Sequence, residues 1–384
     1  MNKKILIVAS VWGFVAKFES EDVRILKELG YEVHFASNKN NPIYRFPENI
    51  YEDMGVVYHD IDIWQSPFGI SHNARAVKQL RGIIKKEQMD VVHCHTPSGG
   101  LVTRLAAFRT SAYVIYTAHG LHFYKGAGRL HNFIFHTIEN FLSRMTDYII
   151  TINHEDYCAA KKMHERDGAC QIPGVGLDRT YFHETTKKQR KEARRKLGVT
   201  NKFMLLGVGE LRENKNPEVI IRALACLKNN GTDISSVCYG LLGAGKQKEE
   251  LENLARQLGV AQQIVFYGYQ MDVRPYLMAA DVMIFPSIRE GLGMAALEAL
   301  AMGVPVLAAD NRGTREYMQD TVNGYVCRDN TPEAFAAYIC RLYTEREKWG
   351  ESVERRAEIR KTTEKFDKKE TAMIMKKVYE HVKN

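Results

Sequence analysis

The chain has 384 residues, of which 45% are hydrophobic and 26% are charged, and its formal net charge is +8. This composition is typical of a soluble globular protein of roughly two to three domains, and it excludes a disordered chain, a collagen-like fibre and a small disulfide scaffold. No apolar run reaches the ~18 residues that a membrane-spanning helix needs. Seven scattered cysteines fit a reducing compartment, so we expect a cytoplasmic protein.

Charge is uneven along the chain. Residues 179–384 carry 34 Lys and Arg against 27 Asp and Glu, so nearly all of the net charge lies in the second half. A basic half suits anionic partners such as phosphates, nucleic acid or a lipid surface. The basic excess is modest and no nucleic-acid recognition motif appears, so we expect no nucleic-acid partner.

The first half of the chain predicts strands that alternate with helices. A helical pattern over 19–29 ends at Gly30. Because the apolar runs alternate little, we expect strands that are buried on both faces of a parallel sheet. These strands are expected at 4–10, 32–36, 90–95, 112–117 and 147–152.

The second half repeats this pattern, with helices expected over 217–229 and 248–258. Its strands are expected at 203–208, 237–242, 264–267, 282–286 and 304–308. A Pro- and Gly-containing linker over 172–182 separates the two series. The fold class is therefore α/β, with two doubly wound domains over 1–178 and 179–365. Ligands of such sheets bind beyond the carboxyl ends of the strands, and we expect the site in a cleft between the domains.

The last stretch, 366–384, predicts a helix. It places Ala372, Met375, Tyr379 and Val382 on one stripe, which needs a surface to cover.

The segment 287–303 carries the densest functional signal. Glu290 precedes a Gly-Leu-Gly turn, and Glu298 lies in the helical run that follows. A glycine turn that leads into a helix presents backbone N–H groups to an anion. In a continuous helix the two carboxylates would lie ~12 Å apart, about the span of a sugar nucleotide from its sugar to its ribose. Carboxylates accept hydrogen bonds from hydroxyl groups. The alternative is a buried helix whose two Glu residues are exposed.

The segment 207–217 follows a predicted strand and leads into a helix with Asn216 as N-cap and Pro217 at its first position. Lys215 and Arg212 lie just before that helix end. Cations at a helix N-terminus are unfavourable unless an anion joins them, and a diphosphate would satisfy both. The alternative is two solvated side chains on a loop.

Residues 240–246 fit G-x-x-x-x-G-K, but Gln247 stands where a P-loop needs Ser or Thr. The missing Mg²⁺-binding hydroxyl disfavours a nucleoside triphosphatase. We expect these glycines to let the backbone pass close to the cleft.

Histidines mark two strand ends in the first half. His93 and His95 share one face of a strand, and His119 lies just past another strand. No third ligand lies at a helpful spacing, so we expect no metal site, and a structural role is favoured for His93. The sequence Asp60-Ile-Asp62 resembles an Asp-x-Asp metal-binding motif, and we interpret it as chance.

Two surface segments remain. Residues 187–196 are rich in Lys and Arg, and residues 123–145 combine aromatic and basic side chains. The first is typical of a solvated helical face, and the alternative is contact with an anionic bilayer at ~1 kcal/mol per basic residue. The second suits a membrane interface, and the alternative is a core helix.

Taken together, the motifs GVGELRENK (207–215), LLGAG (241–245), FYGYQ (266–270) and EGLGMAALE (290–298) resemble the family 4 glycosyltransferases. This resemblance implies the GT-B fold, with two Rossmann-like domains facing a central cleft. The first half is similar to members that build bacterial capsular, exopolysaccharide or related surface glycans. It implies a hexosyltransferase that moves a sugar from a nucleotide-diphosphate sugar, UDP-linked rather than GDP-linked. The acceptor would be a glycan or a polyprenyl-diphosphate-linked molecule at the inner face of the plasma membrane.

The resemblance also implies residue roles. Glu290 would contact hydroxyls of the donor sugar, Glu298 would hold the ribose, and Lys215 would bind the diphosphate. His119 would face the transferred sugar, and the backbone of Gly268 and Tyr269 would contact the base. Backbone N–H groups that touch the sugar and the diphosphate would come from Gly291, Leu292, Gly293 and Met294.

Members of this family retain the anomeric configuration and need no metal or other cofactor, so none is expected here. Their C-terminal helix crosses back onto the first domain, which would explain the stripe at 372–382.

The chain departs from the family pattern in two places. Glu210 stands where the family has Arg, and we hypothesise that Arg212 replaces that Arg. The loop after the first strand has one glycine, Gly13, where many members have two, although we still expect it to approach the phosphates. Two rival functions follow, a non-catalytic partner that kept the fold and a UDP-sugar epimerase. Intact Glu290, Lys215 and His119 argue against the first.

Overall fold

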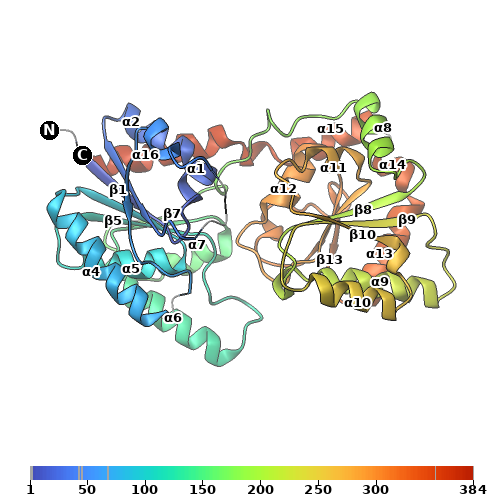
Figure 1. Ribbon diagram of the computed structural model, residues 1–384, viewed down its shortest axis with the longest axis horizontal. Coiled ribbons are helices and arrows are strands. Elements are labelled where there is room, and N and C mark those ends of the chain that lie inside the picture. Colours follow the sequence, from blue (N-terminus) through green and yellow to red (C-terminus); the bar gives the residue numbers. More distant parts are fainter. Residues whose placement is uncertain (1–2, 42–43, 45, 67–68, 351, 384) are drawn as a thin grey trace. The chain divides into compact units, whose positions relative to one another are not determined.

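The computed structural model describes residues 3–41, 44, 46–66, 69–350 and 352–383. The chain divides into two compact units (Figure 1). Unit 1 comprises residues 1–176 and 368–384, and unit 2 comprises residues 177–367. The boundaries expected from the sequence, after residues 178 and 365, each lie two residues from these divisions.

Unit 1 is built on a parallel sheet with strand order β3-β2-β1-β4-β5-β6-β7. Its central strands are continuous apolar runs because helices cover both faces of the sheet. The strands are β1 (Lys4–Val8), β2 (Glu32–Ser37), β3 (Val57–Asp60), β4 (Val91–His95), β5 (Tyr113–Ala118), β6 (Tyr148–Thr151) and β7 (Gly168–Gln171). The helices are α1 (Phe14–Phe18), α2 (Ser20–Glu28), α3 (Ile50–Asp53), α4 (Ile70–Lys86), α5 (Pro97–Ala107), α6 (Arg129–Ser143), α7 (His154–Ala160) and α16 (Lys368–Lys383).

Unit 2 is built on a second parallel sheet, with strand order β10-β9-β8-β11-β12-β13. The strands are β8 (Phe203–Val208), β9 (Val237–Leu242), β10 (Ile264–Gly268), β11 (Val282–Phe285), β12 (Val306–Ala309) and β13 (Gly324–Cys327). The helices are α8 (Lys187–Lys196), α9 (Pro217–Asn229), α10 (Lys248–Gln257), α11 (Arg274–Ala279), α12 (Met294–Ala301), α13 (Pro332–Thr344), α14 (Arg346–Gly350) and α15 (Val353–Lys361). Short 3-10 turns are η1 (Glu213–Lys215), η2 (Ala261–Gln263), η3 (Thr314–Glu316) and η4 (Glu364–Phe366).

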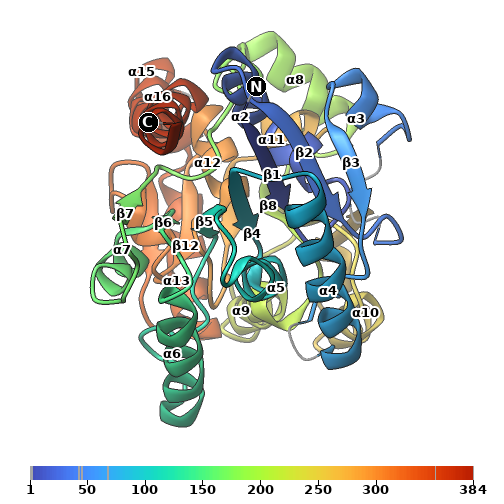
Figure 2. The same ribbon diagram turned by 90° about the vertical axis from the view of Figure 1, so that its left-hand side faces the viewer.

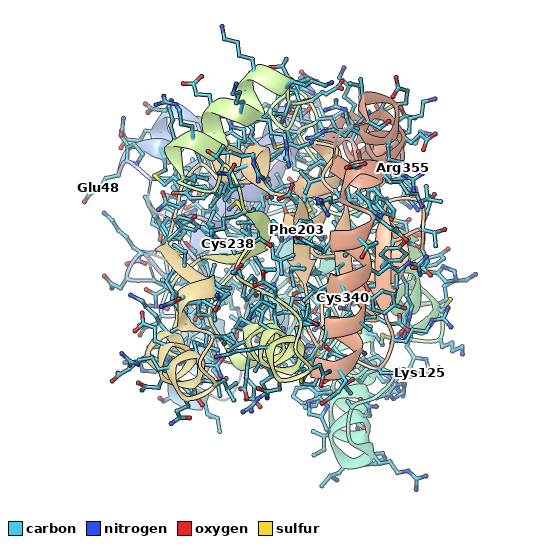
Figure 3. The ribbon with its side chains drawn as sticks, turned by 90° about the vertical axis from the view of Figure 1, so that its right-hand side faces the viewer. Glu48, Lys125, Phe203, Cys238, Cys340 and Arg355 are labelled. Atoms are coloured by element: carbon cyan, nitrogen blue, oxygen red, sulfur yellow. The ribbon has the colours of Figure 1, made fainter. Side chains whose placement is uncertain are left out.

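Helix α13 packs against one end of this second sheet. The ring of Phe203, at the start of β8 (Figure 3), lies edge-on to Tyr343 of α13 with centroids 5.3 Å apart.

Three strands were not predicted from the sequence: β3, β7 and β13. Each has four residues and lies at an edge of its sheet, and β3 and β7 also have no fully buried residue. Such short strands carry little apolar signal, since a neighbouring strand supplies their hydrogen bonds on one side alone.

The C-terminal helix α16 packs beside α2 in unit 1 (Figure 1). Its buried stripe consists of Thr371, Met375, Val378 and Tyr379. Met375 and Tyr379 were predicted for this stripe, whereas Ala372 and Val382 are half-buried and Thr371 and Val378 take their places. The Tyr379 hydroxyl donates a hydrogen bond to Asp22 Oδ2 at 2.6 Å and lies 2.9 Å from His93 Nδ1. This hydroxyl therefore links the last helix to α2 and to the central strand β4.

Helix α6 projects from unit 1 (Figure 2) and leaves most of its apolar side chains exposed. Its buried residues are Leu142 and Ser143. Exposed apolar side chains are Leu130, Phe133, Ile134, Ile138 and Phe141. The alternative of a core helix over 123–145 is therefore wrong, because no element among the described residues of unit 1 buries this face. Among the described residues, no helix is both long and apolar enough to span a bilayer.

Replacing Tyr379 with Phe removes the buried hydroxyl that joins Asp22 to His93. We expect Tyr379→Phe to lower the free energy of unfolding by about 1–3 kcal/mol, because two buried polar groups lose a partner. Urea unfolding followed by circular dichroism measures the change. Tyr338→Phe, which removes a hydroxyl at a half-buried position of α13, is the matched control and should change stability by less than about 0.5 kcal/mol. Equal effects of the two variants would show that the network does not stabilise unit 1.

Candidate functional site

Two loops meet at the carboxyl edge of the sheet in unit 2. One follows β8 and ends in η1, and the other runs from β11 to α12. The Ile288 N–H donates to the Asn214 carbonyl at 2.9 Å, and the Asn214 side chain donates to the Arg289 carbonyl at 2.9 Å. Because β8 and β11 are paired strands, these two hydrogen bonds fix the loops side by side.

The two loops bring Lys215 and Glu290 together. Lys215 Nζ lies 2.5 Å from Glu290 Oε1, and both side chains are mostly buried. The Lys215 ammonium also lies 5.6 Å from the centre of the Phe285 ring. The sequence predicted that the cation before α9 needs an anion, and in this structure the anion is Glu290 itself. An anionic ligand would have to reach Lys215 to replace Glu290 as its partner.

Gly293 determines where α12 begins. Its φ is +97°, and a Cβ at this position would lie 2.8 Å from the Phe285 ring and 3.0 Å from the Tyr317 hydroxyl oxygen. The helix starts at Met294, so Glu290 lies in the loop and Glu298 in the helix. The predicted order, with Glu290 before the glycine turn and Glu298 within the helix, is therefore confirmed, and the ~12 Å separation estimated for a continuous helix does not apply because the left-handed Gly293 lies between them.

The remaining predicted residues of this segment divide by burial. Leu292 is part of the core, whereas Gly291, Met294 and Glu298 are half-buried. The first N–H groups of an α-helix have no partner within the helix, so the start of α12 can donate to an anion.

Arg212 lies apart from this pair. Its Nε is 3.4 Å from Glu210 Oε2, and both side chains are more than half exposed. Asn216 is at the N-cap position of α9 as predicted, but its backbone is left-handed with φ +52° and its side chain makes no capping bond. That side chain contacts Asn330 instead, at 3.4 Å.

The glycines of the segment 240–246 serve close packing of neighbouring loops. A Cβ on Gly243 would lie 1.8 Å from the Gly209 carbonyl oxygen, and one on Gly245 would lie 2.2 Å from the Leu211 carbonyl oxygen. The backbone of segment 240–246 therefore passes close to the loop after β8. Lys246 is exposed.

Gly268 and Tyr269 lie at the end of β10, next to these loops. The Gly268 carbonyl accepts a hydrogen bond from Gly243 N–H at 2.8 Å, and Gly268 has φ +69°. The Tyr269 side chain is exposed. The backbone of both residues thus belongs to the same edge of the sheet as Lys215 and Glu290.

Sequence reasoning missed two polar residues that follow β12. The Asn311 side chain donates to the Ser287 carbonyl at 2.9 Å, and Arg312 Nε donates to the Glu290 carbonyl at 3.4 Å. Arg312 is 5% exposed, which is unusual for an arginine. An Asn-Arg pair directly after a predicted strand was the available signal.

Unit 1 holds a second polar cluster, at the carboxyl ends of β4 and β5. His95 Nδ1 lies 3.1 Å from His119 Nε2 and 3.5 Å from Glu19 Oε1. Burial lowers the pKa of His119 to about 4 and the pKa of His95 well below its usual range, so both rings are neutral at pH 7. Burial, and next the charge of Asp22, raises the pKa of Glu19. Sequence reasoning missed both Glu19 and the pairing of His95 with His119.

Three other predictions concern unit 1. His93 contacts Tyr379 and Thr117 through its two ring nitrogens, at 2.9 and 2.7 Å, which is the structural role that was favoured. Gly13 is buried, and a Cβ there would lie 2.7 Å from Tyr44 Cβ, so packing alone accounts for this glycine. Asp62 lies 3.1 Å from Arg75 Nε, a local ion pair that accounts for its carboxylate.

Comparison with known proteins gives two matches to family models. The model described as Glycosyl transferases group 1 matches residues 189–366, and the model described as Glycosyl transferase 4-like matches residues 4–153. A Bacillus subtilis (strain 168) protein described as putative glycosyltransferase EpsD is 36% identical, covering 99% of this chain and 97% of the relative.

Two further similarities were found. An Escherichia coli UDP-Gal:alpha-D-GlcNAc-diphosphoundecaprenol alpha-1,3-galactosyltransferase is 26% identical, covering 71% of this chain and 73% of the relative. The crystal structure of Anabaena Alr3699/HepE in complex with UDP and glucose aligns with a TM-score of 0.76 at 18% identity, covering 99% of this chain and all of the other. The chain therefore belongs to the group 1 and 4-like glycosyltransferases, and its two Rossmann-like units are those of the GT-B fold.

The contact between Gly243 and Gly209 gives a test of the loop packing. We expect Gly243→Ala to lower the free energy of unfolding by about 2–5 kcal/mol, because a methyl group would overlap the Gly209 carbonyl at a positive φ. Gly231→Ala is the matched control, since Gly231 also has a positive φ but its Cβ would meet nothing within 4 Å. Thermal unfolding by calorimetry measures both. If the control loses as much stability as Gly243→Ala, backbone conformation and not the loop contact decides the cost.

Proposed function

We propose that this glycosyltransferase transfers a sugar, with retention of anomeric configuration, from a UDP-linked donor to a glycan or polyprenyl-diphosphate-linked acceptor in surface polysaccharide synthesis. The observation that carries the proposal is the Lys215–Glu290 pair beside the start of α12. A cation, a carboxylate and the N-terminus of α12 lie together there, and a nucleotide-diphosphate sugar presents a matching diphosphate and hydroxyls.

Donor binding breaks the ion pair between Lys215 and Glu290. The diphosphate takes Lys215 and the N–H groups at the start of α12, and Glu290 then accepts hydrogen bonds from the sugar hydroxyls. Glu298, further along α12, holds the ribose, and the backbone of Gly268 and Tyr269 contacts the base. Gly291 to Met294 supply backbone N–H groups to the sugar and the diphosphate.

Lys215 and the helix end also stabilise the charge that develops on the leaving diphosphate, so transfer needs no metal ion. His119 takes part in the transfer step. The UDP and lipid-linked parts of the proposal rest on the name of the Escherichia coli relative, which is described with a UDP-sugar donor and a diphosphoundecaprenol acceptor.

A thermal-shift panel with UDP, GDP, ADP and CMP, each with and without EDTA, tests the donor site. A ligand at 100-fold excess over its Kd stabilises the native state by about 2.7 kcal/mol. We expect a UDP-selective shift that EDTA does not change. Lys215→Met should raise the Kd for UDP about 10- to 100-fold, since it removes a charge-assisted contact of about 1.5–3 kcal/mol. Arg212→Ala should raise the Kd by a smaller factor, because its side chain is exposed.

Lys246→Met is the matched control, because Lys246 is the exposed lysine of the P-loop-like segment and should leave the Kd unchanged. In a transfer assay with a lipid-linked acceptor, Glu290→Ala and His119→Ala should abolish turnover while circular dichroism stays native. Absence of a shift with every nucleotide would refute the donor site and favour a non-catalytic partner. A UDP-sugar altered without any acceptor present would favour an epimerase.

The exposed face of α6 supports a location at the inner face of the plasma membrane. Five apolar side chains are exposed along 15 residues, with Lys125 and Arg129 at one end and Arg144 at the other. The carboxylate of Glu139 on this helix is paired with Arg104 at 2.8 Å, so it does not oppose anionic lipid. An amphipathic helix with basic ends lies in the interface of an anionic bilayer. A lipid-linked acceptor would be reached there.

Vesicle flotation with and without anionic phosphatidylglycerol tests this surface. Phe133→Ser should lower the partition coefficient onto anionic vesicles about tenfold or more, because burial of one aromatic side chain contributes about 1.5–3 kcal/mol. Ile70→Ser is the matched control, since Ile70 is 79% exposed and Phe133 is 71% exposed, but Ile70 lies at the start of α4. Equal binding of wild type, Phe133→Ser and Ile70→Ser would exclude α6 as the membrane contact.

A further inference from the structure

Three side chains of unit 1 converge on one point. Glu19 lies between α1 and α2, His95 ends β4, and His119 follows β5. One ligand atom from each, a carboxylate oxygen or a ring nitrogen, lies within 4.8 Å of the other two. Glu19 and His95 are buried and His119 is half-buried.

The three side chains point toward one common position and do not form a proton relay through His95. His95 uses the same atom, Nδ1, toward both His119 Nε2 and Glu19 Oε1, at 3.1 and 3.5 Å. A relay through the imidazole would use its two different nitrogens, one toward each neighbour. Four ligands placed tetrahedrally at the ~2.0–2.1 Å of zinc bonds lie about 3.3–3.4 Å from one another. The two observed distances lie on either side of that value.

Space for a fourth ligand adjoins the cluster. A cavity of about 20 Å³ is lined by Glu19, His95 and His119, and further by Thr117, Lys368 and Met375. A volume of about 10–15 Å³ is enough for one water molecule. Three protein ligands and one water are the coordination set of an open zinc site.

Charge favours a cation at the same point. Glu19 and Asp22 are neighbouring buried carboxyl groups. A divalent ion bound to Glu19 would offset the repulsion between these two groups when both are ionised.

We propose that Glu19, His95 and His119 bind one divalent transition-metal ion of the zinc class, with a water molecule as the fourth ligand. Two imidazoles and one carboxylate match zinc or cobalt, whereas magnesium and calcium need six or more oxygen ligands. The bound ion holds His119 through Nε2. Resting on the proposed function, this occupancy inhibits transfer reversibly, because His119 is then withdrawn from the reaction.

The test starts from full-length protein freed of metal by EDTA dialysis. Calorimetric titration with Zn²⁺ should give one equivalent bound, and Co²⁺ added in its place should give the visible spectrum of a tetrahedral ion. Glu19→Gln and His95→Ala should each weaken Zn²⁺ binding about 100-fold or more. Mg²⁺ should not bind. His72→Ala is the matched control, because it removes an exposed imidazole that lies 3.9 Å from the carboxylate of Asp62 and should change nothing.

Glu19→Gln preserves size and so keeps the test valid if His95→Ala does not fold. Zn²⁺ binding that is absent, or that survives both variants, would overturn the proposed site. Binding is measured without nucleotide or acceptor, so it is independent of the transferase proposal. Zinc binding with an enzyme that is inactive even when metal-free would refute the proposed function and leave the metal site intact. Full activity with zinc bound would overturn the inhibitory role.

Discussion

The hydrogen bonds that tie the loop after β8 to the loop after β11 are the constraint on which the candidate donor site depends. Lys215 and Glu290 are 75 positions apart in the chain, and they meet because their strands are paired in a parallel sheet. All carboxyl ends of such a sheet lie at one edge, where backbone groups lose their ladder partners and must find others. Asn214 supplies these partners through both its carbonyl and its side chain.

The energetics of a largely buried ion pair explain why this arrangement suits binding better than it suits stability. Withdrawing an ammonium and a carboxylate from water costs several kcal/mol per ion, and their attraction returns little beyond that cost. A ligand that brings its own anion to Lys215 and its own hydroxyls to Glu290 meets groups that have already lost their water. Under the proposed function, the loops hold the two charges in place for exchange with the donor, and the close approach of Gly243 to the Gly209 carbonyl fixes the spacing of the loops.

The sequence predicted best those helices and strands that are buried as continuous apolar runs. The ranges of β8, β9 and α9 agree with the prediction residue for residue, because these elements are continuous apolar runs or begin with a clear Asn-Pro signal. The strands β3, β7 and β13 were missed because each has four residues, too few to show a period. Lys215 and Glu290 were each identified as ligand residues, but their mutual pairing was not, since spacing along the chain does not show which loops are neighbours. Glu19 was missed for the same reason, as its partners come from β4 and β5.

Glu210 and the nearby Arg212, which was expected to replace the family's arginine, are both exposed to solvent. Glu210 and Arg212 pair with each other on a solvent-exposed part of the loop, where ion pairs are weak and screened by salt. Arg312 is buried, and its Nε donates to the backbone carbonyl of Glu290, so its charge lies beside this loop in a less screened environment. Lys215, Arg312 and the N-terminus of α12 are therefore positive groups that the surrounding structure holds in place at this edge, whereas Glu210 and Arg212 lie on the exposed segment 210–212.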